Sequence, residues 1–477
     1  MRKNLLMILA LGTLLSGTLR AQDLSNIRGI GMAQTTVATS RGTDAIGINP
    51  ANVALPEWNP VTLSLPNLGM KIRTELFTYD IYQNYFTGVP DSTGKRVSKL
   101  LTNADKNNIL SQMPAIPQTR FMSEVQWIGF SLQTPVLGGI GFAIRDHLGT
   151  TIAMSKDYFR LAAFGLDPSG SSYDFSGTSG QAWWYREYNI SYGRKLPVTI
   201  PFLKNLYAGI GVKLIKGYGI FESTQNNTSF TNTPDPSDPF QYITKGKVDF
   251  LARHAGIEML TGDSGKMGPT FNKFKAFPDP IGTGTGFDIG ITGTLLTEIQ
   301  MAVSITNIGK ITWDKNIIES YGNDSVTITN PFTQFVGQND SMLTAIKGKN
   351  RPGASFTTSL PTALRVGMMM EAKNIPGLRF LPGNLILAFD YLQGFNESLG
   401  NTKKPRVSLG MEYRIIPLIP LRTGLSLGGG DIPRWAFGFG IDASVFSFDL
   451  ATDNFGFLFS GKNFQMFSIS AGMKIRI

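Results

Sequence analysis

The last twelve residues of the chain alternate strictly between apolar and polar side chains. The apolar set is Phe467, Ile469, Ala471, Met473, Ile475 and Ile477, and the polar set is Ser468, Ser470, Gly472, Lys474 and Arg476. Because successive side chains of a strand point to opposite faces, this segment has one apolar and one polar face. A strand of this length can cross a bilayer when its neighbours satisfy its backbone, so the pattern predicts a transmembrane β-strand.

The same alternation recurs along the chain. Clear examples are Tyr207–Leu214, Thr362–Glu371, Arg406–Ile415 and Val445–Leu450. Further strands are expected at Leu68–Tyr79, Val125–Gln133, Gly139–Arg145, Trp184–Arg194, Val248–Glu258, Gly286–Leu295, Ile299–Ile308, Leu385–Tyr391, Leu421–Gly428 and Trp435–Asp442. We therefore predict an all-β fold, a transmembrane antiparallel β-barrel of about 14 strands.

A secreted β-sandwich or β-propeller is the alternative, because its strands also alternate. Many of the expected strands are about ten residues long, whereas strands of globular proteins are usually about five or six. Charged residues also lie in the middle of the polar faces, as Arg406, Glu412 and Arg414 do. No internal repeat typical of a propeller is found. These features favour the barrel.

Composition agrees with this prediction. Charged residues make up only 16% of the chain, and no run of about 18 apolar residues follows the first segment, so no transmembrane helix is expected. Barrels hide their apolar residues by alternation. The chain has no Cys, which excludes disulfides, acylation at Cys and thiolate metal sites. The net charge of +10 contains no basic run, so nucleic-acid binding is not expected.

The N-terminus predicts export. Arg2 and Lys3 precede a short apolar stretch, and small and polar residues follow up to Ala21. This order is typical of a secretory signal peptide, and the apolar stretch is too short for a membrane anchor. We expect a signal peptide at 1–21, an N-terminal hatch at 22–58 and the barrel at 59–477, located in the cell outer membrane. Long polar loops are expected at Thr87–Gln118, Glu222–Thr244, Thr261–Gly282 and Trp313–Leu360.

The segment before the first clear strand is rich in small residues and does not alternate. It contains Gly29, Gly31, Met32 and Ala33, then Asp44, Ala45, Asn49, Pro50 and Ala51. This order resembles the start of the superfamily of long-chain fatty-acid transporters (FadL), which includes the PorV and PorQ proteins of type IX secretion. Leu360–Gly367 and Phe389–Tyr391 in the second half resemble PorV-type barrels. The resemblance implies a 14-stranded barrel with a hatch in its lumen, and either hydrophobic-compound transport or protein docking.

Candidate site residues follow from the two faces of the barrel. Arg41 and Asp44 are expected to hold the hatch to the wall, and Asn49 and Pro50 to form a turn, as these residue types do in general. Charged residues of the polar faces are expected to line the lumen, where they solvate a wet interior or pair with acids such as Asp390 and Asp449. These lumen residues are Lys71, Arg73, Glu75, Arg365, Arg406, Glu412 and Arg414.

Catalysis has little support in the sequence. Only His147 and His254 are present, and Asp146 and His147 are adjacent, so on a strand they would point to opposite faces. We expect no catalytic residues, no metal and no cofactor. The aromatic cluster Trp183, Trp184, Tyr185, Tyr188 and Tyr192 is expected to form a membrane-interface girdle, with a hydrophobic pocket as the alternative. Three functions remain open: passive transport of small hydrophobic compounds, docking of a secretion-system protein, and a structural barrel.

Overall fold

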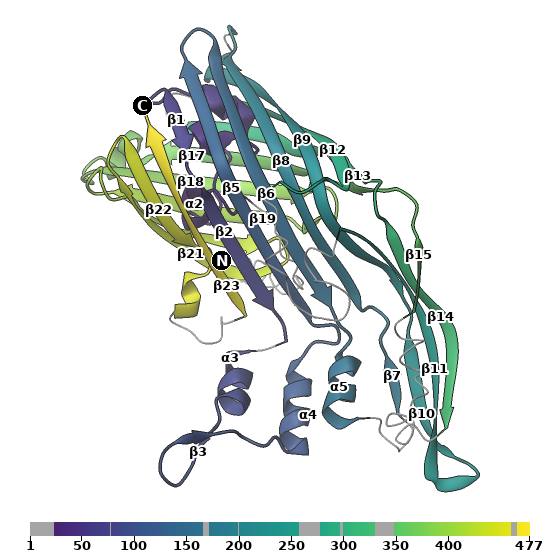
Figure 1. Cartoon of the computed structure of the whole chain (residues 1–477). Helices are drawn as coiled ribbons and strands as arrows, with labels where there is room; N and C mark the ends of the chain where they lie inside the picture. The colour runs from purple at the N-terminus through teal and green to yellow at the C-terminus, as the bar shows by residue number, and fades with distance from the viewer. Residues whose placement is uncertain are drawn as a thin grey trace.

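Fourteen antiparallel strands form a closed barrel in the computed structural model, which describes residues 23–76, 78–165, 171–198, 200–256, 277–295, 299–329, 348–458 and 465–477 (Figure 1). The first wall strand is divided into β1 (Val61–Ser64) and β2 (Asn67–Thr74), and β23 (Met466–Arg476) pairs with both, which closes the ring. The other wall strands are β5 (Gln118–Thr134), β6 (Gly138–Ala153), β8 (Ser179–Lys195), β9 (Leu203–Asn226), β12 (Gly282–Leu295), β13 (Ile299–Trp313), β17 (Ala363–Glu371), β18 (Asn384–Gly394), β19 (Arg406–Arg414), β20 (Leu421–Gly428), β21 (Asp431–Asp442) and β22 (Phe446–Thr452).

The alternation seen in the sequence is the alternation of the wall. On β23, Phe467 and Ile469 are exposed on the outside, whereas Ser468, Ser470 and Lys474 are buried inside. The predicted transmembrane barrel, with its apolar face outward, is therefore confirmed. Within the part of the chain that the structure describes, no helix is both long and apolar enough to span a membrane.

The two halves of the wall differ in height. β5, β6, β8 and β9 have 17, 16, 17 and 24 residues, whereas β20 and β22 have 8 and 7. The long strands lie together on one side of the barrel and the short strands on the other (Figure 1). We call the end of the barrel that holds Ile477 and the connection 135–137 the turn end, and the opposite end the loop end.

The loop end carries an arm on the side of the long strands (Figure 1). Strand β9 continues past the barrel and pairs there with β11 (Asp238–Ala255), which pairs in turn with β14 (Ile318–Thr329). Smaller strands complete the arm and its junction: β7 (Ser172–Asp174), β10 (Ser229–Asp235), β15 (Lys349–Pro352) and β16 (Phe356–Ser359). Tyr173, Phe175, Phe230 and Val248 give the arm a small hydrophobic core of its own.

Short helices lie beside the arm at the loop end (Figure 1). They are α3 (Tyr79–Ile81), η4 (Tyr82–Phe86), α4 (Asn103–Gln112) and α5 (Lys156–Phe164), and the hairpin of β3 (Val89–Pro90) and β4 (Arg96–Val97) lies beside them. Helix α4 begins at a capping box, in which the Thr102 hydroxyl accepts from the Asp105 amide and the Asp105 carboxylate accepts from the Thr102 amide. The described residues of the short-strand side contain three single 3₁₀ turns. Two lie at the turn end, Ala372–Asn374 and Pro376–Leu378, and one lies at the loop end, Phe455–Leu458.

Several expected loops are wrong. Most of Glu222–Thr244 is strand, because Thr-rich segments form ladders well and the β10–β11 hairpin satisfies their backbone. Trp313–Leu360 contains β14, β15 and β16, and Thr87–Gln118 contains β3, β4 and α4. The expected strand Leu68–Tyr79 ends at Thr74, and its earlier part, β1, was missed because Leu65 and Pro66 interrupt the ladder. Most of Thr261–Gly282, like the end of Val248–Glu258, lies outside the described residues.

Candidate functional site

The N-terminal segment fills the lumen. Residues 23–55, which we call the plug, contain α2 (Ile27–Gly31), η2 (Gly42–Ala45) and η3 (Pro50–Ala54), and nearly all of them are buried. Helix α2 contacts β20 to β23 on one side of the wall, whereas η3 contacts β6, β8, β9 and β12 on the other. Because the plug contacts opposite sides of the wall, it lies across the inside of the barrel.

Inward-facing glycines let the plug backbone approach the wall. A Cβ at Gly139 of β6 would overlap the carbonyl oxygen of Val53, and a Cβ at Gly209 of β9 would overlap the backbone of Pro50 and Ala51. On the opposite side, the Cα of Gly31 lies 3.0 Å from where a Cβ of Gly438 would be. Sequence reasoning named Gly29 and Gly31 but missed the wall glycines, whose inward place in the alternation was the available signal.

We predict that Gly139→Ala disturbs the docking of the plug. Overpacking of this kind costs about 1–3 kcal/mol, which corresponds to a change of about 5- to 160-fold in the equilibrium constant for local opening of the plug. The measurement is the rate at which a maleimide labels a single cysteine placed at the buried Thr43, and we expect that rate to rise accordingly. Gly377→Ala is the control, because nothing lies within 4 Å of its added Cβ. Equal labelling rates in the two variants would contradict the close fit.

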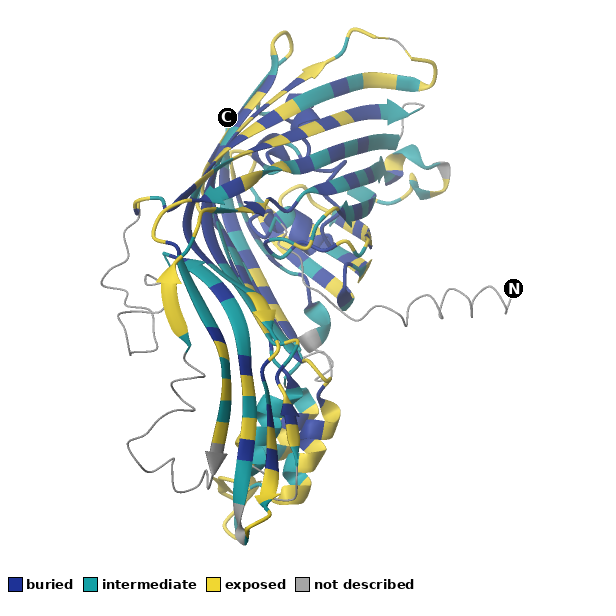
Figure 2. Cartoon of the chain, turned by 90° about the vertical axis from the view of Figure 1, so that its right-hand side faces the viewer, coloured by how far each residue is buried: buried dark blue, intermediate teal, exposed yellow. Residues whose placement is uncertain are grey.

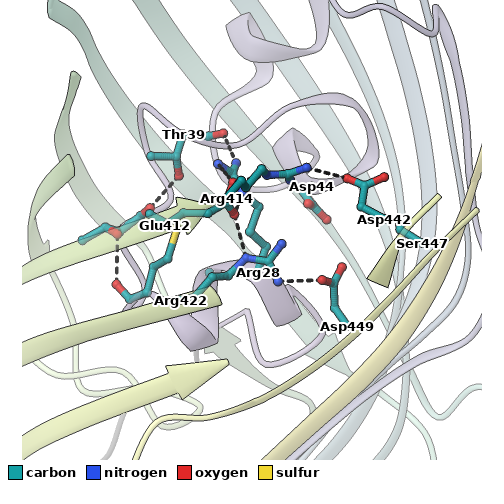
Figure 3. A network of polar contacts seen from close by, with 12 residues as sticks. Arg28, Thr39, Asp44, Glu412, Arg414, Arg422, Asp442, Ser447 and Asp449 are labelled. Atoms are coloured by element: carbon teal, nitrogen blue, oxygen red, sulfur yellow. Dashed lines mark hydrogen bonds and ion pairs between the residues drawn. The ribbon is translucent and has the colours of Figure 1, made fainter. Parts of the chain in front are cut away.

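Charged groups fasten the plug to the short-strand side of the wall (Figure 3). Arg28 of the plug donates from Nε to Glu412 at 2.8 Å and from a terminal nitrogen to the Thr39 carbonyl at 2.6 Å. The side chain of Glu412 is only 1% exposed, and it also pairs with Arg422 at 2.6 Å and Arg414 at 3.1 Å. Glu412 therefore joins three guanidinium groups, one of which belongs to the plug.

Further ion pairs and hydrogen bonds join the plug to strands all around the wall. Asp44 pairs with Lys474 of β23 at 2.5 Å, and Asp23 pairs with Arg365 of β17 at 2.5 Å. The Asp390 carboxylate accepts from the amides of Thr36 and Val37 at 2.6 and 2.9 Å. Further contacts join Asn49 to Thr292 at 2.9 Å, Arg41 to Gln300 at 2.7 Å, Arg406 to Gln34, and Ser25 to Glu124.

Burial affects the ionisation of the plug. It lowers the pKa of the Arg41 guanidinium to about 10, so Arg41 stays charged at neutral pH. Burial alone would raise the pKa of the Asp44 carboxyl, but the ammonium group of Lys474 outweighs it, and the pKa lies below its usual range. Both plug groups thus remain charged at neutral pH.

The sequence-predicted site residues fall into these contacts. Arg41 and Asp44 do not pair with each other, since each bonds to a different wall residue, and Asn49 and Pro50 begin η3. Of the lumen residues, Arg365, Arg406, Glu412 and Arg414 surround the plug, as described above. Lys71 and Arg73 lie nearer the loop end, where both pair with Asp431, and Glu75 pairs with Arg73 at 3.1 Å.

The aromatic girdle prediction is wrong for two of the five residues of its cluster. Trp183 and Tyr185 are buried on the inner face of β8, while Tyr188 and Tyr192 lie on the outer face, because neighbours on a strand alternate. Trp183 belongs to an apolar layer inside the lumen with Met122, Trp313, Leu360 and Leu399. The adjacent residues Asp146 and His147 also have different partners. Asp146 pairs with Arg186 at 2.6 Å, whereas the His147 ring stacks on Tyr185.

The turn-end mouth of the lumen contains a polar cavity of about 610 Å³. Arg28, Arg41 and Asp44 of the plug line it together with Arg414, Asp442, Lys474 and Arg476 of the wall. Among the described residues, no group of three or more His, Asp or Glu side chains is placed to hold a metal ion.

A 14-stranded barrel with an internal plug is thus the class of protein that the fold and the lumen define. The chain belongs to a family of unknown function (DUF5723), whose profile matches residues 50–453. No curated protein matches the chain.

Three solved barrels are similar to the chain at low scores. The toluene transporter TodX of Pseudomonas putida is 9% identical, with 96% of this chain and 98% of that chain covered and a TM-score of 0.39. A TodX deltaS2S3 mutant channel is 10% identical, covers 94% and 97%, and has a TM-score of 0.41. A FadL homologue of Pseudomonas aeruginosa is 12% identical, covers 96% and 99%, and has a TM-score of 0.27. At such scores the barrel is established by its own strand pairing.

Proposed function

We propose that this chain is an outer-membrane barrel that passes small hydrophobic compounds across the membrane without energy input, and that the plug is its gate. The plug closes the lumen, and its fastening to the wall consists of ion pairs and hydrogen bonds that can open without breaking a covalent bond. Outer-membrane barrels place short turns in the periplasm and long loops outside, so the arm would lie at the cell surface and the turn end in the periplasm.

The apolar layer inside the lumen is the observation that supports hydrophobic compounds. Barrels that conduct water and ions have polar interiors. Here, Met122 of β5, Trp183 of β8 and Trp313 of β13 face inward near the loop end. The connection between β18 and β19 lies against them, because a Cβ at Gly400 would touch both Met122 and Trp183. A compound entering from the cell surface would meet this layer before the plug.

A reversible cross-link between plug and wall tests the gate. The hydroxyl oxygens of Thr43 in η2 and Ser64 in β1 are 2.7 Å apart, and the chain has no Cys of its own. Their side chains are therefore close enough for a disulfide in the double variant T43C/S64C. The measurement is uptake of a hydrophobic probe such as labelled toluene by cells whose outer membrane has a lipopolysaccharide outer leaflet. We expect the oxidised variant to lose this uptake and dithiothreitol to restore it.

Single variants T43C and S64C are the controls, and labelled glucose is the polar comparison. Uptake of toluene by the oxidised double variant at the rate of the reduced one would contradict gating by the plug. Uptake of glucose as fast as toluene by the unmodified protein would contradict a hydrophobic substrate class.

Protein docking is the second candidate function, supported by the loop end. Tyr82, Phe86 and Leu100 are exposed there beside the arm, and Leu100 is 93% exposed. A photo-cross-linking amino acid at position 100 in intact cells would test this candidate. A single stoichiometric adduct, lost when Tyr82 and Phe86 are replaced by Ser, would favour docking, and no adduct would disfavour it.

A further inference from the structure

The turn end of the barrel is unusually apolar. Connections between strands at a wet surface are normally built from Gly, Asn, Asp and Ser. Here the exposed fractions of Val136, Phe202 and Phe380 are 77%, 74% and 78%. Other large apolar side chains exposed at this end are Trp58, Leu137, Val198, Ile200, Ile415, Ile416, Leu418, Ile419, Val445 and Ile477. They come from five connections between strands, from the link before β1 and from the residue after β23. Figure 2 shows that strand connections of the barrel are largely exposed.

These side chains continue the outer face of the wall. Strand β20 has only 8 residues, which at about 3.4 Å per residue and a tilt of about 40° span roughly 20 Å. The apolar band of an outer-membrane barrel is about 25 Å tall. Ile415, Ile416, Leu418 and Ile419 directly precede β20 and are exposed, so they extend the band beyond the strand.

Charge distinguishes this end from the other. Among the described residues of the turn end, the most exposed charged side chains are all basic: Arg194, Lys195, Lys204, Lys373 and Arg379. The loop end exposes acids as well, namely Asp80, Asp174, Asp279, Asp314 and Glu397. Of the five cations, Lys373 pairs with the partly exposed Glu371, and the other acids of this end, Glu57 and Asp442, are also only partly exposed. Apolar side chains flanked mainly by Lys and Arg are complementary to a membrane surface that contains anionic phospholipid. A protein partner would not require all exposed charges to have one sign.

We propose that the turn end binds an anionic phospholipid leaflet, with the apolar connections inserted among the acyl chains and the five basic side chains at the phosphate groups. Barrel strands normally bring only their own outer faces into lipid. In this protein the connections themselves enter the leaflet. The binding surface is independent of what passes through the lumen, so failure of the transport proposal would not affect it.

Fluorescent labels at single cysteines test this surface, because the chain contains no Cys. The full-length protein is reconstituted in vesicles of phosphatidylcholine with phosphatidylglycerol, and an environment-sensitive dye is attached at F202C, F380C or V136C. The label at L409C on the outer face of β19 is the lipid-exposed reference, and the label at K95C in the loop end is the water-exposed reference. We expect the three turn-end labels to be quenched by spin-labelled lipid as strongly as L409C, and not by iodide.

Charge is tested on the same labelled proteins. We expect spin-labelled phosphatidylglycerol to quench the F380C label roughly two- to fivefold more strongly than spin-labelled phosphatidylcholine. Replacing the five basic residues of the turn end by Gln should bring this ratio to about one, whereas replacing Lys95, Lys245, Lys247, Lys315 and Lys349 of the loop end should leave it unchanged. The heat-induced mobility shift of barrels on gels verifies that each variant is folded.

Two results would overturn the proposal. Turn-end labels that iodide quenches as strongly as K95C would place the connections in water, where a soluble partner or a second copy would be needed to cover them. If spin-labelled phosphatidylglycerol and spin-labelled phosphatidylcholine quench the F380C label equally in the protein with its five basic residues intact, the surface does not select anionic lipid.

Discussion

Removing residues 23–55 is expected to convert a closed barrel into an open channel. The plug crosses the lumen, with α2 against β20 to β23 and η3 against β6, β8, β9 and β12. Among the described residues, its loss leaves only the apolar layer and the connection between β18 and β19 to obstruct the lumen. We expect ion conductance in planar bilayers to rise by about tenfold or more over the intact protein, because a barrel of this size is closed only by what fills it. Current recordings on the refolded deletion protein provide the measurement.

The control for this deletion is the cross-linked double variant T43C/S64C, which keeps the plug and should stay closed under oxidising conditions. Entry of glucose into cells that carry the deletion protein gives a second readout. A deletion protein that is folded, as judged by its heat-induced gel shift, but conducts no better than the intact protein would show that the plug does not close the lumen.

Glu412→Ala is expected to be the most destabilising single substitution in the lumen. It leaves Arg28 without a carboxylate partner and removes one partner each from Arg422 and Arg414. Breaking a buried ion pair on one side costs about 3–5 kcal/mol, because an uncompensated charge stays out of water. The free energy of unfolding in lipid, measured with guanidinium chloride, should fall by that amount.

Glu371→Ala is the matched control for this substitution. Glu371 pairs with the exposed Lys373, and its side chain is 29% exposed, so its loss should cost no more than about 1 kcal/mol. Adding Arg28→Met to Glu412→Ala should recover part of the lost stability, because Arg414 and Arg422 keep Asp442 and Asp449 as partners. If Glu412→Ala and Glu371→Ala cost the same, Glu412 does not hold the network together.

The wall could be predicted from the sequence because a strand that separates lipid from a polar lumen must alternate. Residues 466–477 and 406–415 show this directly, and their outward and inward faces agree with the structure. The arm could not be predicted in the same way. Its strands face water or each other, so Thr231, Thr233 and Pro234 resemble loop residues until pairing between β10 and β11 places them in a ladder.

The candidate site was predictable as a set of residues but not as a set of pairs. Alternation placed Arg365, Arg406 and Glu412 on the inner face. It did not indicate that Glu412 would meet Arg28, which lies 384 positions away. Alternation separates Trp183 from Trp184, but the clustering of aromatic residues was interpreted as a girdle without assigning each member to a face. Pairing across a closed ring depends on register, and register is set by the whole wall.

The unequal heights of the two sides give the loop end of the molecule a high flank and a low flank. The arm rises from the long strands alone, whereas β20 and β21 are joined on the opposite side by a turn in which Gly428, Gly429 and Gly430 all have positive φ. Large surface polymers that approach from the arm's flank would be held away from the rim. In the orientation proposed above, a molecule in the outer leaflet would reach the mouth more easily over the low flank, so access would depend on direction in the plane of the membrane.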